Sequence, residues 1–213
     1  MNERLAWTGI VLAGGRSRRF GGIDKGRLLV GRRPLLQRSL DALAPVTSLQ
    51  IVAGGRPDSV VTTFPDQYPD EGPLGGLLTA LAHLRTTHAL IVACDLPFLT
   101  ADLLRAVQTA GTTSPMACIE MHDGRSPLCL SLHRDTRAVI AAYWEAGGRR
   151  IGGLRGVLPH TTVAQATLDR LDPTGRILLN VNDPLTYARA LAEARHDCAA
   201  SYFTDLDESK RTT

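Results

Sequence analysis

The sequence predicts an α/β fold with a mostly parallel central sheet, and two observations indicate it. Short apolar runs rich in β-branched residues, typical of buried strands, alternate with longer segments of helical pattern. In those longer segments leucines recur every three or four residues, which places them on one stripe facing the sheet. The 213 residues suit one sizeable domain over residues 1–200, and the polar stretch 201–213 is expected to be a disordered tail.

The first expected strand is Gly9–Leu12, because this run is too short and too β-branched to begin a helix. Two further apolar runs of the same kind predict strands over Leu49–Ala53 and Ala89–Ala93. Weaker patterns favour four more strands, over Val60–Thr63, Met116–Met121, Leu128–Leu132 and Ile177–Val181.

Helices are expected to alternate with these strands. Thr100 and Asp183 have the side chains preferred at helix N-caps, and proline suits the first turn of a helix. The expected helices begin at Pro34, Gly75, Ala101, Arg134 and Pro184.

Composition and charge exclude several classes of function. Lys and Arg number 24 against 21 Asp and Glu, and a net charge of +3 is too small to indicate a nucleic-acid partner. Apolar runs fall far short of the roughly 20 residues that cross a membrane. The first residues lack the apolar core of a signal peptide, so a cytoplasmic location is expected.

The cysteines (94, 118, 129 and 198) form no Cys-x-x-Cys pair, which favours reduced core residues over a zinc site.

A glycine-rich, basic segment directly after the first strand is the most informative local feature. It reads LAGGRSRRFGGIDK and ends at Lys25. Glycines let a backbone approach a ligand closely and turn its amides inward, while Arg and Lys supply charge for a triphosphate. The segment matches neither the P-loop pattern nor the dinucleotide G-x-G-x-x-G pattern. We expect a nucleotide to bind here, with Lys25 and Arg19 screening phosphate charge; the alternative is a flexible surface loop.

A second polar position follows the apolar run Ala89–Ala93. Asp95 is predicted at the carboxyl end of an interior strand, where ligands gather in open α/β sheets. A carboxylate there is costly to desolvate without a partner, and Mg²⁺ suits it when phosphates are near. The alternative is that Asp95 caps a turn. The glycine-rich corner 72–76 begins a helix whose amides, Gly75 among them, can face the nucleotide.

Two pairs of residues are candidates for contact with a second substrate. Asn180 and Asn182 are two positions apart in an expected strand, so their side chains are predicted to share a face and line the site. Arg149 and Arg150 follow two glycines and are candidates for an acceptor's phosphate or ring system, although a solvated surface position is the alternative.

Together, LAGGRSRRFGGIDK, GPLGG at 72–76, CDLP at 94–97 and NVNDP at 180–184 resemble the molybdenum cofactor guanylyltransferase family. The segment AGGRR at 146–150 is similar to a further family segment, and the match extends from about residue 8 to 194. The resemblance implies a three-layer, Rossmann-like nucleotidyltransferase fold. It also implies transfer of GMP from GTP to molybdenum-loaded molybdopterin, with Mg²⁺ as cofactor, release of pyrophosphate, and molybdoenzyme chaperones as further partners.

The resemblance also implies roles for individual residues. Nucleotide contacts would come from the first strand's end and its loop, with Lys25 on phosphate and Asp95 holding Mg²⁺. In full, the implied nucleotide-binding residues are Leu12, Ala13, Gly14, Gly15, Lys25, Asp66, Gly75 and Asp95. The catalytic candidates are Lys25, Asp95 and Arg19.

Two departures from the family pattern leave alternatives open. Ala53 stands where the family has an Asn that contacts the nucleotide, and Asp183 replaces a Thr before the last proline. The first departure leaves cytidylyl transfer, or nucleotidyl transfer to another phosphorylated acceptor, as alternative activities. A non-catalytic nucleotide- or cofactor-binding module is a further alternative, which the presence of both Lys25 and Asp95 disfavours.

Overall fold

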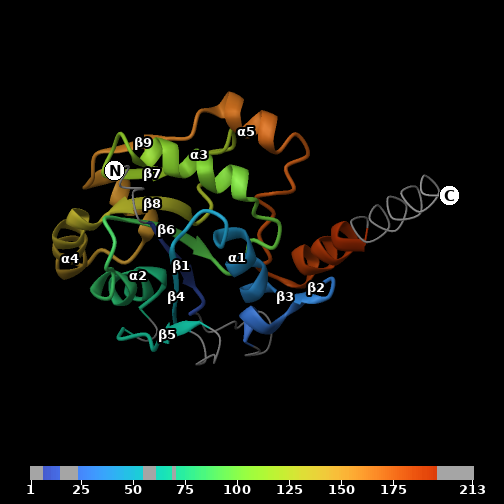
Figure 1. The fold of residues 1–213 in the computed structure, drawn as a ribbon, viewed down its shortest axis with the longest axis horizontal. Helices are drawn as coiled ribbons and strands as arrows, with labels where there is room; N and C mark the ends of the chain where they lie inside the picture. Colours follow the sequence, from blue (N-terminus) through green and yellow to red (C-terminus); the bar gives the residue numbers. More distant parts are fainter. Residues whose placement is uncertain (1–6, 15–23, 55–60, 69–70, 196–213) are drawn as a thin grey trace.

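The computed structural model describes residues 7–14, 24–54, 61–68 and 71–195, and the fold below is that of these residues. A seven-stranded sheet has the strand order β5-β4-β1-β6-β8-β7-β9 (Figure 1). Its strands are β1 (Trp7–Leu12), β4 (Leu49–Ala53), β5 (Thr62–Phe64), β6 (His88–Ala93), β7 (Met116–Cys118), β8 (Cys129–His133) and β9 (His160–Thr162). Four neighbouring pairs are parallel, and β8 is antiparallel to both β6 and β7. The expected mostly parallel α/β sheet is confirmed.

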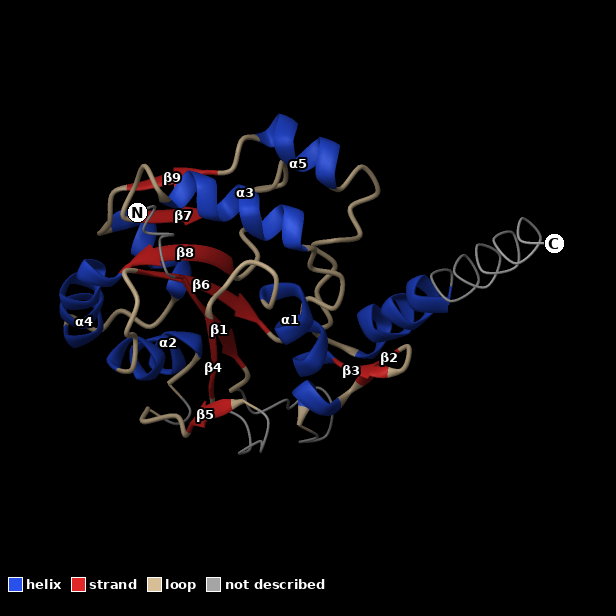
Figure 2. Cartoon of the chain, in the orientation of Figure 1, coloured by secondary structure: helices blue, strands red, loops and turns tan. Residues whose placement is uncertain are grey.

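Helices cover both faces of the sheet, which gives three layers (Figure 2). One face packs against α1 (Leu35–Leu43), α3 (Ala101–Gly111) and α5 (Gln165–Leu171). The other face packs against α2 (Pro73–Ala82), α4 (Arg137–Glu145) and the 3-10 turn η4 (Ile151–Gly156). Within the described residues, no helix combines the length and apolarity needed to cross a membrane.

Strict alternation along β1 divides its side chains between the two layers. Trp7 and Val11 lie in the cluster beneath α1 and α3, whereas Ile10 and Leu12 lie in the cluster beneath α2. All six residues of β1 are buried, as expected for a central strand covered on both faces. This double burial explains why the run reads as continuously apolar in the sequence.

The strand order reverses between β1 and β6, and we call the region at the carboxyl ends of these two strands the crevice. From β1 the chain adds β4 and β5 on one side of the sheet, then returns to place β6 on the other side. Ligands in open α/β sheets bind where the strand order reverses in this way. Leu12 pairs with Ala93 at this edge, and the amide of Cys94 donates to the Leu12 carbonyl at 3.2 Å.

A small additional layer lies beside the main sheet. A two-stranded ribbon, β2 (Leu29–Val30) and β3 (Arg33–Pro34), follows the 3-10 turn η2 (Lys25–Arg27). The last described helix, residues 184–195, packs on this ribbon, and the Tyr187 hydroxyl donates to the Leu29 carbonyl at 2.8 Å (Figure 1). The sequence pattern predicted this helix but not the ribbon.

The strand expected over Ile177–Val181 is wrong. This segment forms a turn, in which the amide of Leu179 donates to the carbonyl of Arg176 at 3.0 Å, followed by irregular chain. Asp172, before the turn, accepts hydrogen bonds from the amides of Arg176 and Leu178. These carboxylate contacts satisfy the backbone locally, so the apolar residues there are buried without pairing in a sheet.

Other expected elements differ only in their bounds. The strand predicted over Met116–Met121 ends at Cys118, and β5 begins at Thr62. The helix expected from Gly75 begins two residues earlier at Pro73, and Pro34 lies at the N-cap of α1 instead of in its first turn. The helix expected from Arg134 begins as a 3-10 turn, and α4 itself starts at Arg137. The expected tail, 201–213, lies outside the described residues.

Candidate active site

The backbones of Gly14 and Gly54 are in close contact where β1 and β4 end. The amide of Ala13 donates to the Ala53 carbonyl at 3.0 Å, which extends the parallel pairing of the two strands. Gly54 follows with a φ of +75°, and a Cβ added to it would lie 2.7 Å from both Cα and N of Gly14. Only glycine fits at position 54, because it tolerates both this left-handed conformation and the close approach. The Gly14 backbone is thereby fixed at the crevice.

Asp66 lies next to this glycine pair and next to the start of α2. A Cβ added to Gly14 would lie 3.6 Å from Asp66 Oδ2, and one added to Gly75 would lie 3.7 Å from Asp66 Oδ1. The Oδ1 atom accepts a hydrogen bond from the Tyr68 amide at 2.9 Å and is 3.5 Å from the Thr79 hydroxyl. The structure thus brings together three nucleotide-binding candidates that are far apart in the sequence, namely Gly14, Asp66 and Gly75.

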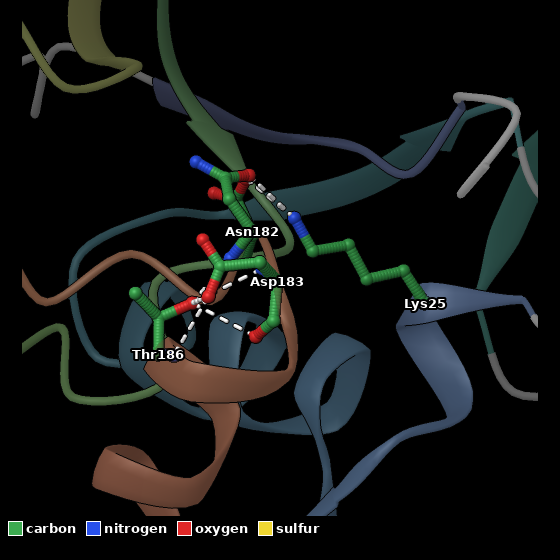
Figure 3. Close-up of polar contacts among 5 residues, drawn as sticks. Lys25, Asn182, Asp183 and Thr186 are labelled. Atoms are coloured by element: carbon green, nitrogen blue, oxygen red, sulfur yellow. Dashed lines mark hydrogen bonds and ion pairs between the residues drawn. The ribbon is translucent and has the colours of Figure 1, made fainter. Parts of the chain in front are cut away.

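Lys25 reaches across the crevice to Asp95. Its Nζ lies 3.0 Å from Asp95 Oδ2. The same Nζ lies 2.8 Å from Asn182 Oδ1 (Figure 3). Both side chains of the ion pair are mostly buried, with exposed fractions of 17% and 16%. Asp24 caps the turn that carries Lys25, because its Oδ1 accepts from the Gly26 amide at 3.0 Å. The two catalytic candidates, separated by 70 residues in the chain, are therefore in direct contact.

The end of the Ile177–Val181 segment is hydrogen-bonded to Asp95, which follows β6. The Val181 amide donates to the Asp95 carbonyl at 2.8 Å. Asp183 then caps the last described helix, because its Oδ1 accepts from the Thr186 amide at 2.8 Å (Figure 3). The expected cap at Asp183 is confirmed, and it fixes Asn182 at the edge of the site.

Two buried oxygens at this end of the sheet make no hydrogen bond to any residue in the described parts of the chain. They are Asp95 Oδ1 and Asn180 Oδ1. A buried acceptor without a partner is costly, and at a functional site it points to a ligand or ion. Carboxylate and amide oxygens are the donors that Mg²⁺ prefers. The residues present therefore fit a magnesium ion held by Asp95, although the described residues contain no cluster of three or more His, Cys, Asp or Glu side chains suited to a metal.

The thiol of Cys94 contributes no nucleophile beside Asp95. Burial raises the pKa of Cys94 to about 12, and the neighbouring Asp95 carboxylate also acts to raise it. The thiol is therefore protonated at neutral pH and is not a nucleophile at this site. Cys94, Cys118 and Cys129 are buried and unbridged, as the sequence predicted.

A largely apolar pocket of about 220 Å³ opens on the α2 side of the sheet. Its floor is formed by side chains of β7 and β8, including Met116, Cys118 and Leu130. One end borders the crevice, because the carbonyl of the lining residue Leu128 accepts from the Ala93 amide at 2.9 Å. Pro73, at the start of α2, also lines it. The pocket thus lies beside the candidate nucleotide site.

The two arginines proposed as acceptor contacts both line this pocket, in different environments. Arg149 is held in place: its Nε is 2.8 Å from Glu71 Oε2, and its guanidinium lies over the Trp144 ring, 4.1 Å from the centroid. Arg150 makes no side-chain hydrogen bond or ion pair with another described residue and is exposed. Arg155 also lines the pocket, and its Nη1 is 3.3 Å from Glu120 Oε2.

Two predicted site residues, Gly15 and Arg19, lie outside the described residues. Ala53, the departure from the family pattern, is completely buried in the apolar cluster beneath α2. Its contribution at the crevice is the backbone carbonyl that holds Ala13.

Sequence reasoning missed Gly54, Tyr68 and Arg155 as parts of the site. The positive φ of Gly54 carries a weak signal in the pair Gly54-Gly55 after a strand. Tyr68 packs against Gly75, whose added Cβ would lie 2.8 Å from the Tyr68 Cβ, and no local motif indicates that contact. Arg155 lies in a 3-10 turn without a periodic pattern.

The family model for the MobA-like NTP transferase domain matches residues 9–158. The molybdenum cofactor guanylyltransferase of Xanthomonas euvesicatoria pv. vesicatoria is 33% identical over 198 residues, which cover 91% of this chain and 98% of that protein. Among solved structures, the molybdopterin-guanine dinucleotide biosynthesis protein A of Archaeoglobus fulgidus superimposes with a TM-score of 0.74 at 18% identity, covering 89% of this chain and 99% of that one.

A second solved structure shows how widely the fold is shared. The 2-C-methyl-D-erythritol 4-phosphate cytidylyltransferase of Thermus thermophilus superimposes with a TM-score of 0.67 at 17% identity, covering 87% of this chain and 98% of that one. The fold alone therefore does not choose the base or the acceptor. The family match and the curated relative go further: the chain belongs to the MobA-like NTP transferase family, together with the molybdenum cofactor guanylyltransferases, and is a nucleotidyltransferase.

Proposed function

We propose that this enzyme transfers GMP from GTP to molybdenum-loaded molybdopterin and releases pyrophosphate. The observation that carries the proposal is the contact of Lys25 Nζ with Asp95 Oδ2 at 3.0 Å, in the crevice between β1 and β6. A phosphate-binding cation and a metal-binding carboxylate meet where the strand order reverses, beside the Gly14 backbone. The molybdenum cofactor enters as substrate because the 33% identical relative is named for that reaction.

The nucleotide lies over the ends of β1 and β4 in this proposal. Leu12, Ala13, Gly14 and Gly15 contribute backbone groups to the base and ribose, and Asp66 contacts the nucleotide from the side. The N-terminus of α2, which begins at Pro73, lies beside Asp66, and its positive dipole end favours an anionic ligand. Gly75 contributes its close packing against Asp66 and Tyr68, since its amide donates to the Gly72 carbonyl at 3.1 Å. Lys25 and Arg19 neutralise phosphate charge.

In the transfer, a phosphate oxygen of the acceptor attacks the α-phosphorus of GTP. The bond from that phosphorus to the oxygen bridging to the β-phosphate breaks, and pyrophosphate leaves with the bonding electrons. Two anions must approach each other in line, so positive charge and positioning carry the catalysis. Mg²⁺ held by Asp95 supplies Lewis-acid stabilisation when bound. Lys25 orients and neutralises the phosphates from the opposite side of the crevice.

The acceptor binds on the other side of Asp95. Asn180 and Asn182 flank Val181, whose amide donates to the Asp95 carbonyl, so both asparagines lie near the end of β6. The pocket lined by Arg149 and Arg150 also borders the end of this strand. A flat ring system suits the apolar floor of that pocket, and Arg150 has no competing partner among the described residues. The buried Cys118 thiol, whose pKa burial raises, leaves the floor uncharged.

The choice of guanine as the base needs its own test, because Ala53 stands where the family has an Asn that contacts the nucleotide. Calorimetric titration with GTP, CTP and ATP, each with Mg²⁺, tests it directly. GTP is expected to bind at least about tenfold tighter than either competitor, since a site built for one base leaves polar groups unpaired with another. A preference for CTP would assign cytidylyl transfer to the same cofactor instead.

Addition of molybdenum-loaded molybdopterin to the GTP complex then tests the reaction. Release of one pyrophosphate per dinucleotide formed is expected. Nucleotide binding without pyrophosphate release would favour the non-catalytic alternative, and release with a phosphorylated sugar would favour another acceptor. Binding to a molybdoenzyme chaperone is a separate expectation, checked by co-purification with and without cofactor.

A further inference from the structure

Lys25 and a divalent cation would both bind the carboxylate of Asp95. Lys25 Nζ is 3.0 Å from Asp95 Oδ2, while Asp95 Oδ1 is buried and has no partner among the described residues. The second oxygen ligand near Lys25, Asn182 Oδ1, lies 2.8 Å from the same Nζ. One ammonium group therefore contacts two side-chain oxygens, one of Asp95 and one of Asn182.

Two cations on one carboxylate repel each other strongly. A divalent cation on Asp95 Oδ1 and the ammonium group on Asp95 Oδ2 would share one carboxylate, and like charges at such short range repel each other. Both side chains are about five-sixths buried, so solvent screens this repulsion weakly. The repulsion is relieved when the lysine or the metal meets the negative charge of a triphosphate.

We propose that Lys25 excludes a divalent cation from Asp95 until a nucleoside triphosphate is present. The phosphates draw the ammonium group away from Asp95 and neutralise both cations, so the metal enters with the nucleotide and not before it. Lys25 thus has a second role besides holding phosphate, since it sets the order of binding. The inference rests on the proposed site, but it concerns the metal affinity of this chain alone and does not depend on the base or the acceptor.

The test measures Mn²⁺ binding to the full chain without nucleotide, by the electron paramagnetic resonance signal of free Mn²⁺. Lys25→Met keeps the length and removes the charge. It is expected to bind one Mn²⁺ at least about tenfold tighter than the wild type. Lys25→Arg keeps the charge and is expected to stay within about threefold of the wild type.

Two further variants assign any gain to its cause. Asp95→Asn combined with Lys25→Met is expected to abolish the gain, since the carboxylate is its origin. Arg33→Met removes a cation whose guanidinium pairs with Asp41 on the exposed surface, and it is expected to leave Mn²⁺ binding unchanged. Circular dichroism verifies folding, and Lys25→Gln replaces Lys25→Met if the latter does not fold.

Three outcomes would overturn the inference. One is a Met or Gln variant that binds Mn²⁺ no tighter than the wild type. The second is an Arg variant that binds as tightly as the Met variant, which would exclude charge as the cause. The third is a gain that persists without Asp95 or appears equally in Arg33→Met. A failure of GMP transfer would not change any of these results, because no nucleotide or acceptor is present.

Discussion

The two halves of the sheet differ in the kind of groups they expose: polar side chains at strand ends in one half, and an apolar pocket in the other. The parallel half, β5-β4-β1-β6, ends in polar groups with specific partners: the Gly14–Gly54 contact, Asp66, and the Lys25–Asp95 pair. The mixed half, β8-β7-β9, offers an apolar pocket with arginines at its rim. The first arrangement suits a phosphate-rich nucleotide, and the second suits a larger, partly apolar acceptor.

The difference follows from strand direction. Parallel strands deliver all their carboxyl ends to one edge, so loops after β1, β4 and β6 converge on the same crevice. Antiparallel pairing of β8 with β6 and β7 breaks that convergence, and the pocket there lies against the face of the strands instead. Each half is thus expected to respond to a different kind of substitution.

The largest effect is expected from Asp95→Ala in the parallel half. Loss of the carboxylate proposed to hold the metal should lower Mg²⁺-dependent pyrophosphate release about a thousandfold or more, because a metal Lewis acid contributes several kcal/mol. The measurement is pyrophosphate release at saturating Mg²⁺, with circular dichroism to verify folding. Turnover near that of the wild type would remove Asp95 from its proposed role.

A structural test of the same half compares two glycines. Gly54 and Gly124 have φ values of +75° and +76°, but only Gly54 lies against another backbone, whereas nothing is within 4 Å of a Cβ added to Gly124. Gly124→Ala is expected to lower the free energy of unfolding by about 1 kcal/mol from its conformation alone. Gly54→Ala should cost about 2 kcal/mol more, because the Gly14 backbone must shift.

Urea unfolding of both variants checks this difference, and GTP titration gives a second readout. Gly54→Ala should also weaken GTP binding, whereas Gly124→Ala should leave it unchanged. Equal costs for the two alanines would mean that the close contact of Gly14 with Gly54 does not shape the nucleotide site.

In the mixed half, Arg150→Ala is expected to raise the KM for the acceptor about tenfold, the effect of losing one charge-assisted hydrogen bond. The Kd for GTP should not change, because Arg150 lines the pocket and not the crevice. Arg170→Ala, an exposed arginine of α5 on the other face, is the matched control. A change in GTP affinity without a change in acceptor KM would reverse the assignment of the two halves.

The sequence predicted the parallel half better than the mixed half, for physical reasons. β1, β4 and β6 are buried on both faces, so their continuous apolar runs identify them, and their loops carry glycines and charges in compact motifs. Single-sequence patterns therefore suffice where one edge of the sheet gathers the site. The topology places Asp95 at the carboxyl end of β6, whereas Lys25 lies in the turn η2, so its contact with Asp95 depends on the packing of that turn.

The mixed half resisted the same reasoning. β9 has three residues, too few to show a period, and neither β9 nor α5 was predicted. The strand predicted over Met116–Met121 extends past the end of β7 at Cys118. The Asn180–Asn182 pair was assigned to a strand because apolar residues surround it, yet Asp172 holds that segment in a turn. The pocket depends on tertiary packing of η4 against β7 and β8, which no local pattern encodes.

The smallest effect, on the pH dependence of stability, is expected where β6 pairs with β8 and joins the two halves of the sheet. At the amino-terminal end of β6 in this seam, His88 pairs with His133 of β8. His88 stacks on Trp7 with centroids 4.6 Å apart and meets the edge of His133 at 4.8 Å. Burial lowers the pKa of His88 below its usual value of about 6.5, and the neighbouring His133 lowers it further.

The sign of the resulting pH dependence follows from proton binding. Below about pH 6.5 the unfolded chain takes up a proton at His88 that the folded chain binds poorly, so the stability present above that pH falls as the pH falls. His88→Phe keeps the ring against Trp7 and removes the titration, and it should reduce the loss of stability between about pH 7 and 5. His122→Gln, at an exposed histidine, should not. Urea midpoints at the two pH values give the comparison.

GTP affinity at neutral pH should be unchanged in both variants, because the amino-terminal end of β6 faces away from the crevice. A loss of GTP affinity in His88→Phe would mean that the two halves of the sheet are coupled along β6.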